Sequence, residues 1–241
     1  MQQYYLTTRE GFTEAIRLAH GALELDPRFG LVAALAGASH MNNVTLGYAA
    51  DPQFERKEAV RLLRLALSTD DNDPDTLAFA AMTSAFMVGD SESEIEMADR
   101  AVGLNPNSFR AWSGRGHVYR IAGLPEEALQ SYERAIRMSP IDPLLHRAFV
   151  GMGMAFIELG RFDEAIVVGK KAQRQNPSYS SAYCCLASAF AHLGRDAKAR
   201  EAAARVLELD PAFTIAGWIA RGWRSNSKLQ IEGLRKAGLP E

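Results

Sequence analysis

The residue types that most often perform catalysis or bind metals are few in this chain, and no familiar spacing joins them. The five histidines are scattered, and the two cysteines are adjacent. There is no His-Glu-x-x-His pair, no repeated Cys-x-x-Cys and no glycine-rich phosphate loop of the Walker type. The spacing therefore predicts no catalytic residue, no metal and no cofactor, and we expect this chain not to be an enzyme. The residues concerned are His20, His40, His117, His146, His192, Cys184 and Cys185.

The adjacent cysteines, Cys184 and Cys185, bear on the cellular compartment. Neighbouring cysteines cannot join distant parts of a fold, so their use favours a reducing compartment and a cytoplasmic location. A vicinal disulfide would also strain a helix. We interpret the two thiols as small residues that pack between helices, with a redox pair as the alternative.

The composition is that of a globular protein without a strong charge bias. Of the 241 residues, 47% are hydrophobic and 23% are charged, and the formal net charge is −2. A core can form, and the basic excess typical of nucleic-acid binders is missing. The longest apolar stretches, Leu31–Met41 and Ala78–Val88, are too short to span a membrane, and Met1–Tyr5 lacks the regions of a signal peptide. We expect no contact with nucleic acid or membranes.

Glycines and prolines recur along the chain with the same rhythm. Both residue types show spacings of 34, 37 and 34 residues. A shared rhythm, including one shared three-residue insertion within Ile141–Leu145, indicates an internal repeat. The glycines are Gly89, Gly123, Gly160 and Gly194, and the prolines are Pro106, Pro140, Pro177 and Pro211.

Between these glycines and prolines, apolar residues follow helical spacing. Trp112, Gly116 and Tyr119 lie at i, i+4 and i+7, and a second face follows Gly123. The pattern predicts helix A, a tight glycine turn, and helix B ended by proline. Small residues where two helices cross let the backbones approach, and aromatic residues fill the space beside them. The second faces are Ala128, Tyr132 and Ala135, then Ala165 and Ala172, then Ala199 and Val206.

These positions resemble the 34-residue signature of the tetratricopeptide repeat (TPR). The resemblance is strong over Phe109–Phe213 and weaker upstream. It implies an all-α fold, a right-handed superhelix (α-α solenoid) of stacked helix pairs with a C-terminal capping helix. The matching residues are Trp112, Gly116, Tyr119, Gly123, Ala128, Tyr132, Ala135 and Pro140. We expect a single domain of units at about 1–29, 30–73, 74–108, 109–145, 146–179 and 180–213, followed by capping helices over 214–241.

Upstream of Phe109 the repeat is less regular. About ten extra residues around Asn42–Pro52 predict a long loop. Asp71 stands where proline is usual, and Glu94 stands where a small residue belongs, which leaves the register there open. At the other end, we interpret Trp223 and a predicted helix over Lys228–Ala237 as the C-terminal cap. Basic residues in the last turn of that helix suit the helix dipole.

The closing residues, Glu232–Glu241, resemble the last segment of a group of bacterial multidomain proteins, mainly from α-proteobacteria. In that group a class III adenylate/guanylate cyclase domain, or a winged-helix DNA-binding domain, precedes C-terminal TPRs. The resemblance implies that this chain is the regulatory region of an adenylate cyclase-like signalling protein, although it lacks the cyclase domain itself. Because the chain starts inside a repeat, we expect a fragment of a longer protein; a short native protein with a degenerate first repeat is the alternative.

The TPR resemblance also implies a concave groove lined by helices A, which suits an extended peptide or a partner helix. The groove positions lie opposite the face of Trp112, Gly116 and Tyr119. They are Arg110, Ser113, His117 and Arg120, then Arg147, Val150 and Met154, then Ser181, Cys184, Ser188 and His192, with Phe79, Thr83 and Phe86 as further candidates upstream.

Several groove residues have two interpretations. Arg110, Arg120 and Arg147 either bind a partner's carboxylates or are simply solvated. Phe79 and Phe86 either face a ligand or are buried. The sequence leaves both choices open.

One kind of TPR groove is not reproduced. TPRs that clamp acidic chaperone tails resemble one another in Lys or Arg and Asn at set groove positions. The matching positions here are Ser113, His117, Val150 and Met154. Arg115 stands at an inner position that leucine usually occupies, and the sequence offers no account of it.

The hypotheses about function differ in class. The first is a non-catalytic scaffold for a protein or peptide partner, and the second is the regulatory arm of a cyclase or of a winged-helix transcriptional regulator. The third is a self-association module that forms a homo-oligomer through its N-terminal end. A free-standing enzyme ranks last.

Overall fold

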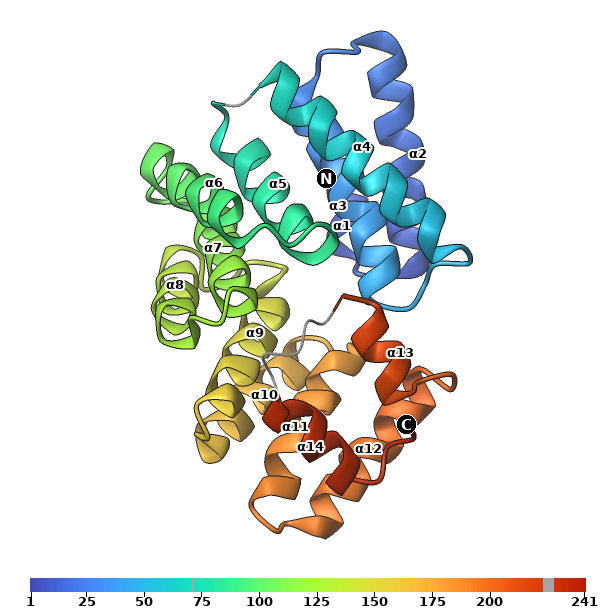
Figure 1. Ribbon diagram of the computed structural model, residues 1–241, viewed down its shortest axis with the longest axis vertical. Helices are drawn as coiled ribbons and strands as arrows, with labels where there is room; N and C mark the ends of the chain where they lie inside the picture. The colour runs from blue at the N-terminus through green and yellow to red at the C-terminus, as the bar shows by residue number, and fades with distance from the viewer. Residues whose placement is uncertain (71, 223–227) are drawn as a thin grey trace. The chain divides into compact units, whose positions relative to one another are not determined.

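The computed structural model describes residues 1–70, 72–222 and 228–241, and no β-strand occurs in these ranges. Fourteen α-helices follow one another along them. They form two compact units, Met1–Ala122 and Gly123–Glu241 (Figure 1). The all-α fold expected from the sequence is therefore confirmed, and each unit is described by itself.

Unit 1 contains seven helices, and its helices pack in pairs. α3 packs along α4 and α5 packs along α6, while the first helices of successive pairs, α3, α5 and α7, contact one another. This is the arrangement that the two-helix repeat predicts. The helices are α1 (Gln2–Tyr5), α2 (Arg9–Leu25), α3 (Gly30–Thr45), α4 (Pro52–Thr69), α5 (Pro74–Met87), α6 (Ser91–Leu104) and α7 (Phe109–Ile121).

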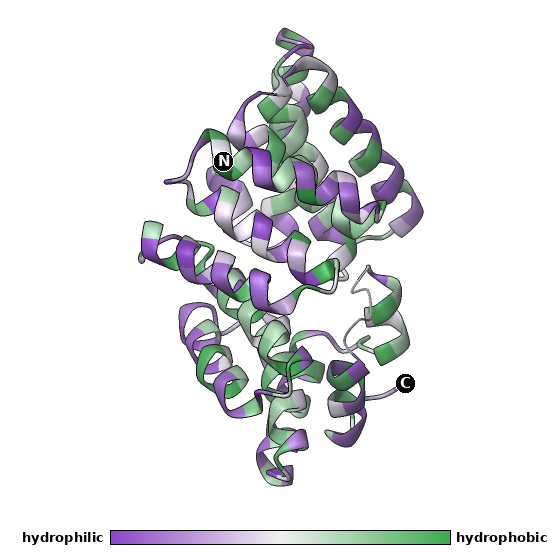
Figure 2. Ribbon diagram, turned by 60° about the vertical axis from the view of Figure 1, so that its left-hand side comes forward, coloured by the Kyte–Doolittle hydropathy of each residue, from purple (hydrophilic) through white to green (hydrophobic). Residues whose placement is uncertain are grey.

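Unit 2 repeats the plan and adds two short helices. α9 packs along α10 and α11 packs along α12, α9 also contacts α11, and α14 packs against α11 and α9. The hydropathy colouring in Figure 2 shows hydrophilic and hydrophobic residues side by side on single helices, as helices with one buried face require. The helices are α8 (Pro125–Met138), α9 (Leu145–Glu158), α10 (Phe162–Gln175), α11 (Ser180–His192), α12 (Asp196–Leu209), α13 (Ile215–Ala220) and α14 (Lys228–Lys236).

The turns between the paired helices depend on glycine. Gly89, Gly123, Gly160 and Gly194 have φ values of 87°, 83°, 71° and 65°. An L-residue with a side chain rarely adopts this left-handed conformation, whereas glycine adopts it without steric cost. The tight glycine turn predicted at each of these positions is therefore confirmed.

Alanines of the second helices are buried in the core. Ala101, Ala135 and Ala172 are fully buried. A buried cluster in unit 1 joins Ala101 to Leu77, Ala78, Val102 and Ala111. In unit 2 the backbones approach so closely that a Cβ on Gly153 would lie 2.4 Å from Cys185 Sγ. Small side chains thus allow the close approach on which the packing density of the core depends.

The sequence left the register of the third repeat open at Glu94. In the structure this repeat has the same register as the neighbouring repeats. Glu94 is 1% exposed and takes the position that Ala128 has one repeat later. One of its carboxylate oxygens accepts hydrogen bonds from Ser84 Oγ (3.0 Å) and from the backbone N–H groups of Gly89 (3.0 Å) and Asp90 (2.8 Å). A buried carboxylate is tolerated because these three donors replace water.

The unexplained Arg115 also has a physical role. Its Nε donates to Asp99 Oδ1 on α6 at 2.6 Å, and its guanidinium lies 3.9 Å from the centroid of the Tyr119 ring. Tyr119 Oη donates to the same carboxylate at 2.8 Å. The ion pair and the tyrosine hydrogen bond therefore connect α7 to Asp99 of α6 where a leucine would supply apolar packing, and the cation–π contact holds Arg115 against Tyr119 within α7.

The long loop predicted around Asn42–Pro52 is shorter than expected. α3 continues to Thr45, so the first residues of the expected loop are helical. Asn42 donates to the Ala38 carbonyl (2.7 Å) and Asn43 donates to Glu55 (3.3 Å), so the amide nitrogens of both buried side chains have partners inside the helix pair. The extra residues therefore lengthen the helix as well as the loop.

The C-terminal helix predicted over Lys228–Ala237 is present as α14, with Arg235 and Lys236 in its last turn. The positions of Trp223 and Asp71, which the sequence also singled out, lie outside the described residues. None of the described helices combines the length and apolar composition that a bilayer crossing needs. The division into repeat units within one domain stays a prediction.

Replacing Ala135 or Ala172 with Asp tests the helix crossings. Each substitution buries a charge without a partner at a fully buried position, so we expect the free energy of unfolding to fall by at least about 3 kcal/mol. Urea titration followed by circular dichroism measures it. Glu126→Ala, at an exposed position of α8, is the control and should change stability little; unchanged unfolding of both Asp variants would contradict the alignment of the repeats.

Candidate functional site

The residues predicted to line a groove lie on the first helices of the repeats, α7, α9 and α11. Most of them are buried, and only Arg110 and His192 are partly exposed. Phe79 and Phe86, for which burial was one of two interpretations, are buried. The buried members are Ser113, His117, Arg120, Arg147, Val150, Met154, Ser181, Cys184 and Ser188. The residues predicted to line the groove therefore do not form an exposed surface in the structure.

In unit 2 the C-terminal helix α14 covers the groove face of α11 (Figure 1). His192 Nε2 lies 2.7 Å from the Leu229 carbonyl, and Ser188 Oγ donates to the Gln230 carbonyl at 3.2 Å. In return Gln230 Nε2 donates to the Cys184 carbonyl at 3.2 Å. Because a carbonyl accepts, the proton of His192 must be on Nε2 in this contact. The predicted groove residues of α11 thus contact a helix of the same chain.

The close approach of α14 to α11 depends on Gly233. A Cβ at this position would lie 2.0 Å from Ser188 Oγ and 2.8 Å from Ser188 Cα. Because the Cα atom belongs to the backbone, a side chain at position 233 could not be accommodated by rotating Ser188 alone. The absence of a side chain therefore sets the distance between these two helices.

In unit 1 the short N-terminal helix α1 covers the equivalent face. Arg110 on α7 donates to Tyr5 Oη at 3.0 Å and to Asp75 at 2.6 Å, and its guanidinium lies 4.5 Å from the centroid of the Phe79 ring. Tyr4 packs edge-on against Phe79, with ring centroids 5.5 Å apart. Arg110 therefore pairs with a carboxylate of its own chain. One interpretation from the sequence was that it binds a carboxylate of a partner.

The two cysteines are free and buried. Burial raises the pKa of both thiols, that of Cys185 to about 12. Both side chains are therefore protonated thiols at neutral pH, and thiols react far more slowly than thiolates. Their surroundings fit the interpretation as packing residues.

His146, at the start of α9, is buried against Tyr179, with ring centroids 4.9 Å apart. Its Nδ1 lies 3.2 Å from the Pro143 carbonyl. Burial, and secondarily the nearby charge of Arg147, lowers the pKa of His146 to about 4. The imidazole is therefore neutral in the folded protein at neutral pH.

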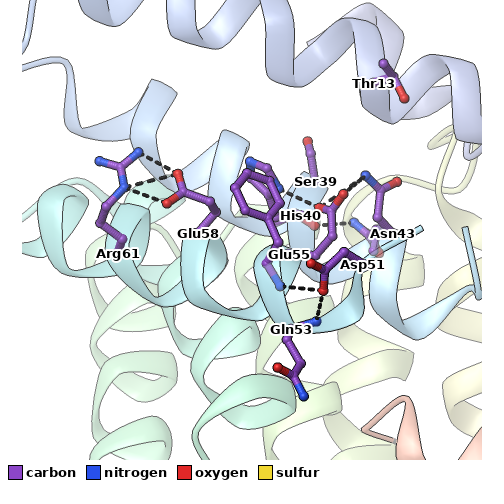
Figure 3. A network of polar contacts seen from close by, with 12 residues as sticks. Thr13, Ser39, His40, Asn43, Asp51, Gln53, Glu55, Glu58 and Arg61 are labelled. Carbon is purple, nitrogen blue, oxygen red and sulfur yellow. Dashed lines mark hydrogen bonds and ion pairs between the residues drawn. The ribbon is translucent and has the colours of Figure 1, made fainter. Parts of the chain in front are cut away.

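One polar cluster was not expected from the sequence. His20 on α2, His40 on α3 and Glu58 on α4 come together in unit 1. Figure 3 shows His40 and Glu58 in the network of polar contacts beside Glu55. The sequence expectation of scattered histidines missed this group because its members come from three helices with no common spacing.

Comparison with known proteins supports the repeat over part of the chain. A family model described as tetratricopeptide repeat matches residues 89–143 and 150–212. Small glutamine-rich tetratricopeptide repeat-containing protein 2 of Mycosarcoma maydis is 33% identical over 85 residues, which is 35% of this chain and 23% of that protein. The chain spans about a quarter of the length of the curated relatives it matches.

Solved structures share the fold. A chain of the APC/C hetero-tetramer Cut9–Hcn1 superposes with a TM-score of 0.66 at 15% identity, over 94% of this chain and 39% of that one. YrrB, described as a TPR protein with an unusual peptide-binding site, gives a TM-score of 0.50 at 21% identity, over 73% of this chain and 90% of that one. At these identities the likeness concerns the fold alone.

The low pKa of His146 predicts a pH dependence of stability. The folded state keeps the imidazole neutral down to about pH 4, whereas the unfolded state takes up a proton near its ordinary pKa of about 6.5. Between these values the unfolded state binds more protons, so stability falls as the pH is lowered. From pH 7 to pH 5 we expect this group to remove about 2 kcal/mol.

The His146→Phe variant isolates this effect, because phenylalanine keeps a ring beside Tyr179 and cannot titrate. Urea unfolding of the wild type and the variant at pH 7 and pH 5 measures the loss of stability that each protein shows between the two pH values. The variant should lose less stability than the wild type over this interval. Equal losses in the two proteins would show that His146 is not held neutral.

Proposed function

We propose that this TPR protein is a non-catalytic interaction scaffold whose repeats hold a helix or peptide against the inner faces of their first helices. The observation that supports this most directly is the contact of α14 with α11. There the residues predicted to bind a partner already bind a helix, supplied by the chain itself. Recognition of a helix in a groove is one of the common modes of peptide binding.

The chemistry of the α11 face suggests what it accepts. Ser188 and His192 contact the backbone carbonyls of Gln230 and Leu229, whereas the Gln230 side chain donates to the Cys184 carbonyl. Carbonyl contacts carry little sequence information, because every residue has a carbonyl. The close approach at Gly233, however, requires a small residue at the crossing point. A suitable ligand is therefore a short helix with glycine at its point of closest contact.

Occupation of the face by α14 has a consequence for partners. A segment of the same chain acts at a high effective concentration, so a separate peptide of similar affinity cannot compete with it. A partner must bind more tightly than α14 or bind after α14 has left. The function of YrrB, which its description connects with peptide binding, supports the general class of ligand.

The wider setting that we propose is the regulatory or interaction region of a bacterial adenylate cyclase-like signalling protein in the cytoplasm. The supporting observation is the resemblance of Glu232–Glu241 to the closing segment of such proteins. The interaction region of a winged-helix regulator and a self-association module are the alternatives. Sequencing the gene upstream of Met1 separates the first two, and light scattering at high concentration tests the third.

Gly233→Val tests the groove directly. The valine side chain would collide with Ser188, so α14 should leave the α11 face while the helix pairs remain folded. A fluorescent peptide with the wild-type sequence of residues 228–241 should then bind the variant, with the wild-type chain binding at least about 10-fold more weakly because its own helix competes. Fluorescence anisotropy measures the affinities.

Gly103→Val is the matched control, because a Cβ at Gly103 on α6 meets nothing within 4 Å. It should bind the peptide no better than the wild type. His192→Ala, which removes one contact to α14 without overfilling the interface, should give intermediate binding. A folded Gly233→Val chain that does not bind the peptide would refute the proposed groove.

A further inference from the structure

Three helices of unit 1 bring potential metal ligands to one place. His20 lies on α2, His40 on α3 and Glu58 on α4. One ligand atom from each, an imidazole nitrogen or a carboxylate oxygen, lies within 4.8 Å of the other two. His20 and Glu58 are partly exposed and His40 is buried, so the group lies just below the surface of the unit.

The orientation of His40 leaves one nitrogen for a ligand. Its Nδ1 lies 2.5 Å from Glu55 Oε2, and the same carboxylate accepts from Asn43 Nδ2 (Figure 3). The other ring nitrogen, Nε2, is buried and has no hydrogen-bond partner in the structure. With the side chain only about 5% exposed, a lone nitrogen of this kind costs free energy unless something binds it.

We propose that His20, His40 and Glu58 form a binding site for a divalent transition metal, with Zn²⁺ as the expected ion. Two imidazole nitrogens and one carboxylate oxygen are a ligand set that zinc accepts. Glu55 would hold His40 in place through Nδ1, as outer carboxylates do for metal-bound histidines. The fourth position of a tetrahedral site would be left for water or for a group of a partner.

The distances are compatible with coordination. Ligand atoms about 2.0–2.1 Å from a tetrahedral zinc ion are about 3.3 Å apart, and the separations of up to 4.8 Å in this group require only small side-chain rotations. Because the three helices belong to one unit and α3 packs on both α2 and α4, the backbone already places the ligands.

Glu58 can serve as a ligand without giving up its present partner. It forms a two-point ion pair with Arg61 at 2.8 and 3.1 Å. A carboxylate has about four acceptor positions, so one oxygen is able to bind a cation while Arg61 remains on the other side. The Arg61 side chain is 53% exposed, and such a pair opposes rearrangement only weakly.

Bound zinc would connect α2 to the pair of α3 and α4. A ligand that binds only the folded state stabilises that state by mass action. The site would therefore hold the first long helix of the chain in place, and its effect on stability would depend on the zinc concentration. This inference does not rest on the proposed peptide groove.

The test is titration of the full chain, freed of metal by a chelator, with Zn²⁺ alone. Calorimetry should show one equivalent bound, and thermal unfolding should shift to higher temperature with added zinc. Substitution of Co²⁺ should give the visible absorption of a tetrahedral site. His20→Asn and Glu58→Gln, at partly exposed positions that are expected to fold normally, should abolish these effects. Glu55→Gln should weaken binding about 10–100-fold.

Glu96→Gln, at an exposed position of α6, is the matched control and should leave zinc binding unchanged. Circular dichroism verifies that each variant is folded. A wild-type chain that binds no zinc at micromolar concentrations would overturn the proposal. So would zinc binding that persists undiminished in both His20→Asn and Glu58→Gln, because the ion would then be held elsewhere.

Discussion

The close crossing of paired helices is the constraint on which the rest of the structure depends. Fully buried alanines at Ala101, Ala135 and Ala172 let the backbones approach, and glycines with positive φ turn the chain back within a few residues. A larger side chain has no free space at these alanines, and at the turn glycines a side chain would strain the backbone, because φ is positive there. The position of each first helix, and so of the residues on its inner face, follows from these crossings.

Two polar residues enter this apolar frame with hydrogen-bond partners of their own. Glu94 replaces a small residue and receives three donors from the adjoining turn. Arg115 replaces an apolar residue and is paired with Asp99 against the Tyr119 ring. Both polar residues leave the repeat register unchanged, because each has hydrogen-bond partners within the fold. Asn42 does the same in the lengthened α3, where it donates to the Ala38 carbonyl.

The inner faces of the first helices are covered from within the chain in both units. In unit 1 Tyr4 and Tyr5 of α1 contact Phe79 and Arg110. In unit 2 α14 contacts α11 through backbone carbonyls, the Gln230 side chain and the glycine at position 233. Under the function that we propose, α14 competes with a partner for the inner face of α11. Zinc bound to His20, His40 and Glu58, as we also propose, would connect α2 to α3 and α4.

The sequence by itself determined the repeat, the positions of the glycine turns, the pairing of helices and the C-terminal helix. These features are local, because hydrophobic periodicity and backbone conformation are encoded within one repeat of about 34 residues. The irregular positions, such as the end of α3, were missed because buried amide contacts overrode the loop that composition suggested.

Only the tertiary structure decided which contacts the helices make outside the repeated pairs. The covering of Ser188 and His192 by α14 joins residues about 40 positions apart. The meeting of His20, His40 and Glu58 joins three helices. No sequence period or motif predicts such contacts, because they depend on the angle at which each helix crosses the next. The residue types of the groove were therefore readable from the sequence, whereas their burial and their partners required the packed helices.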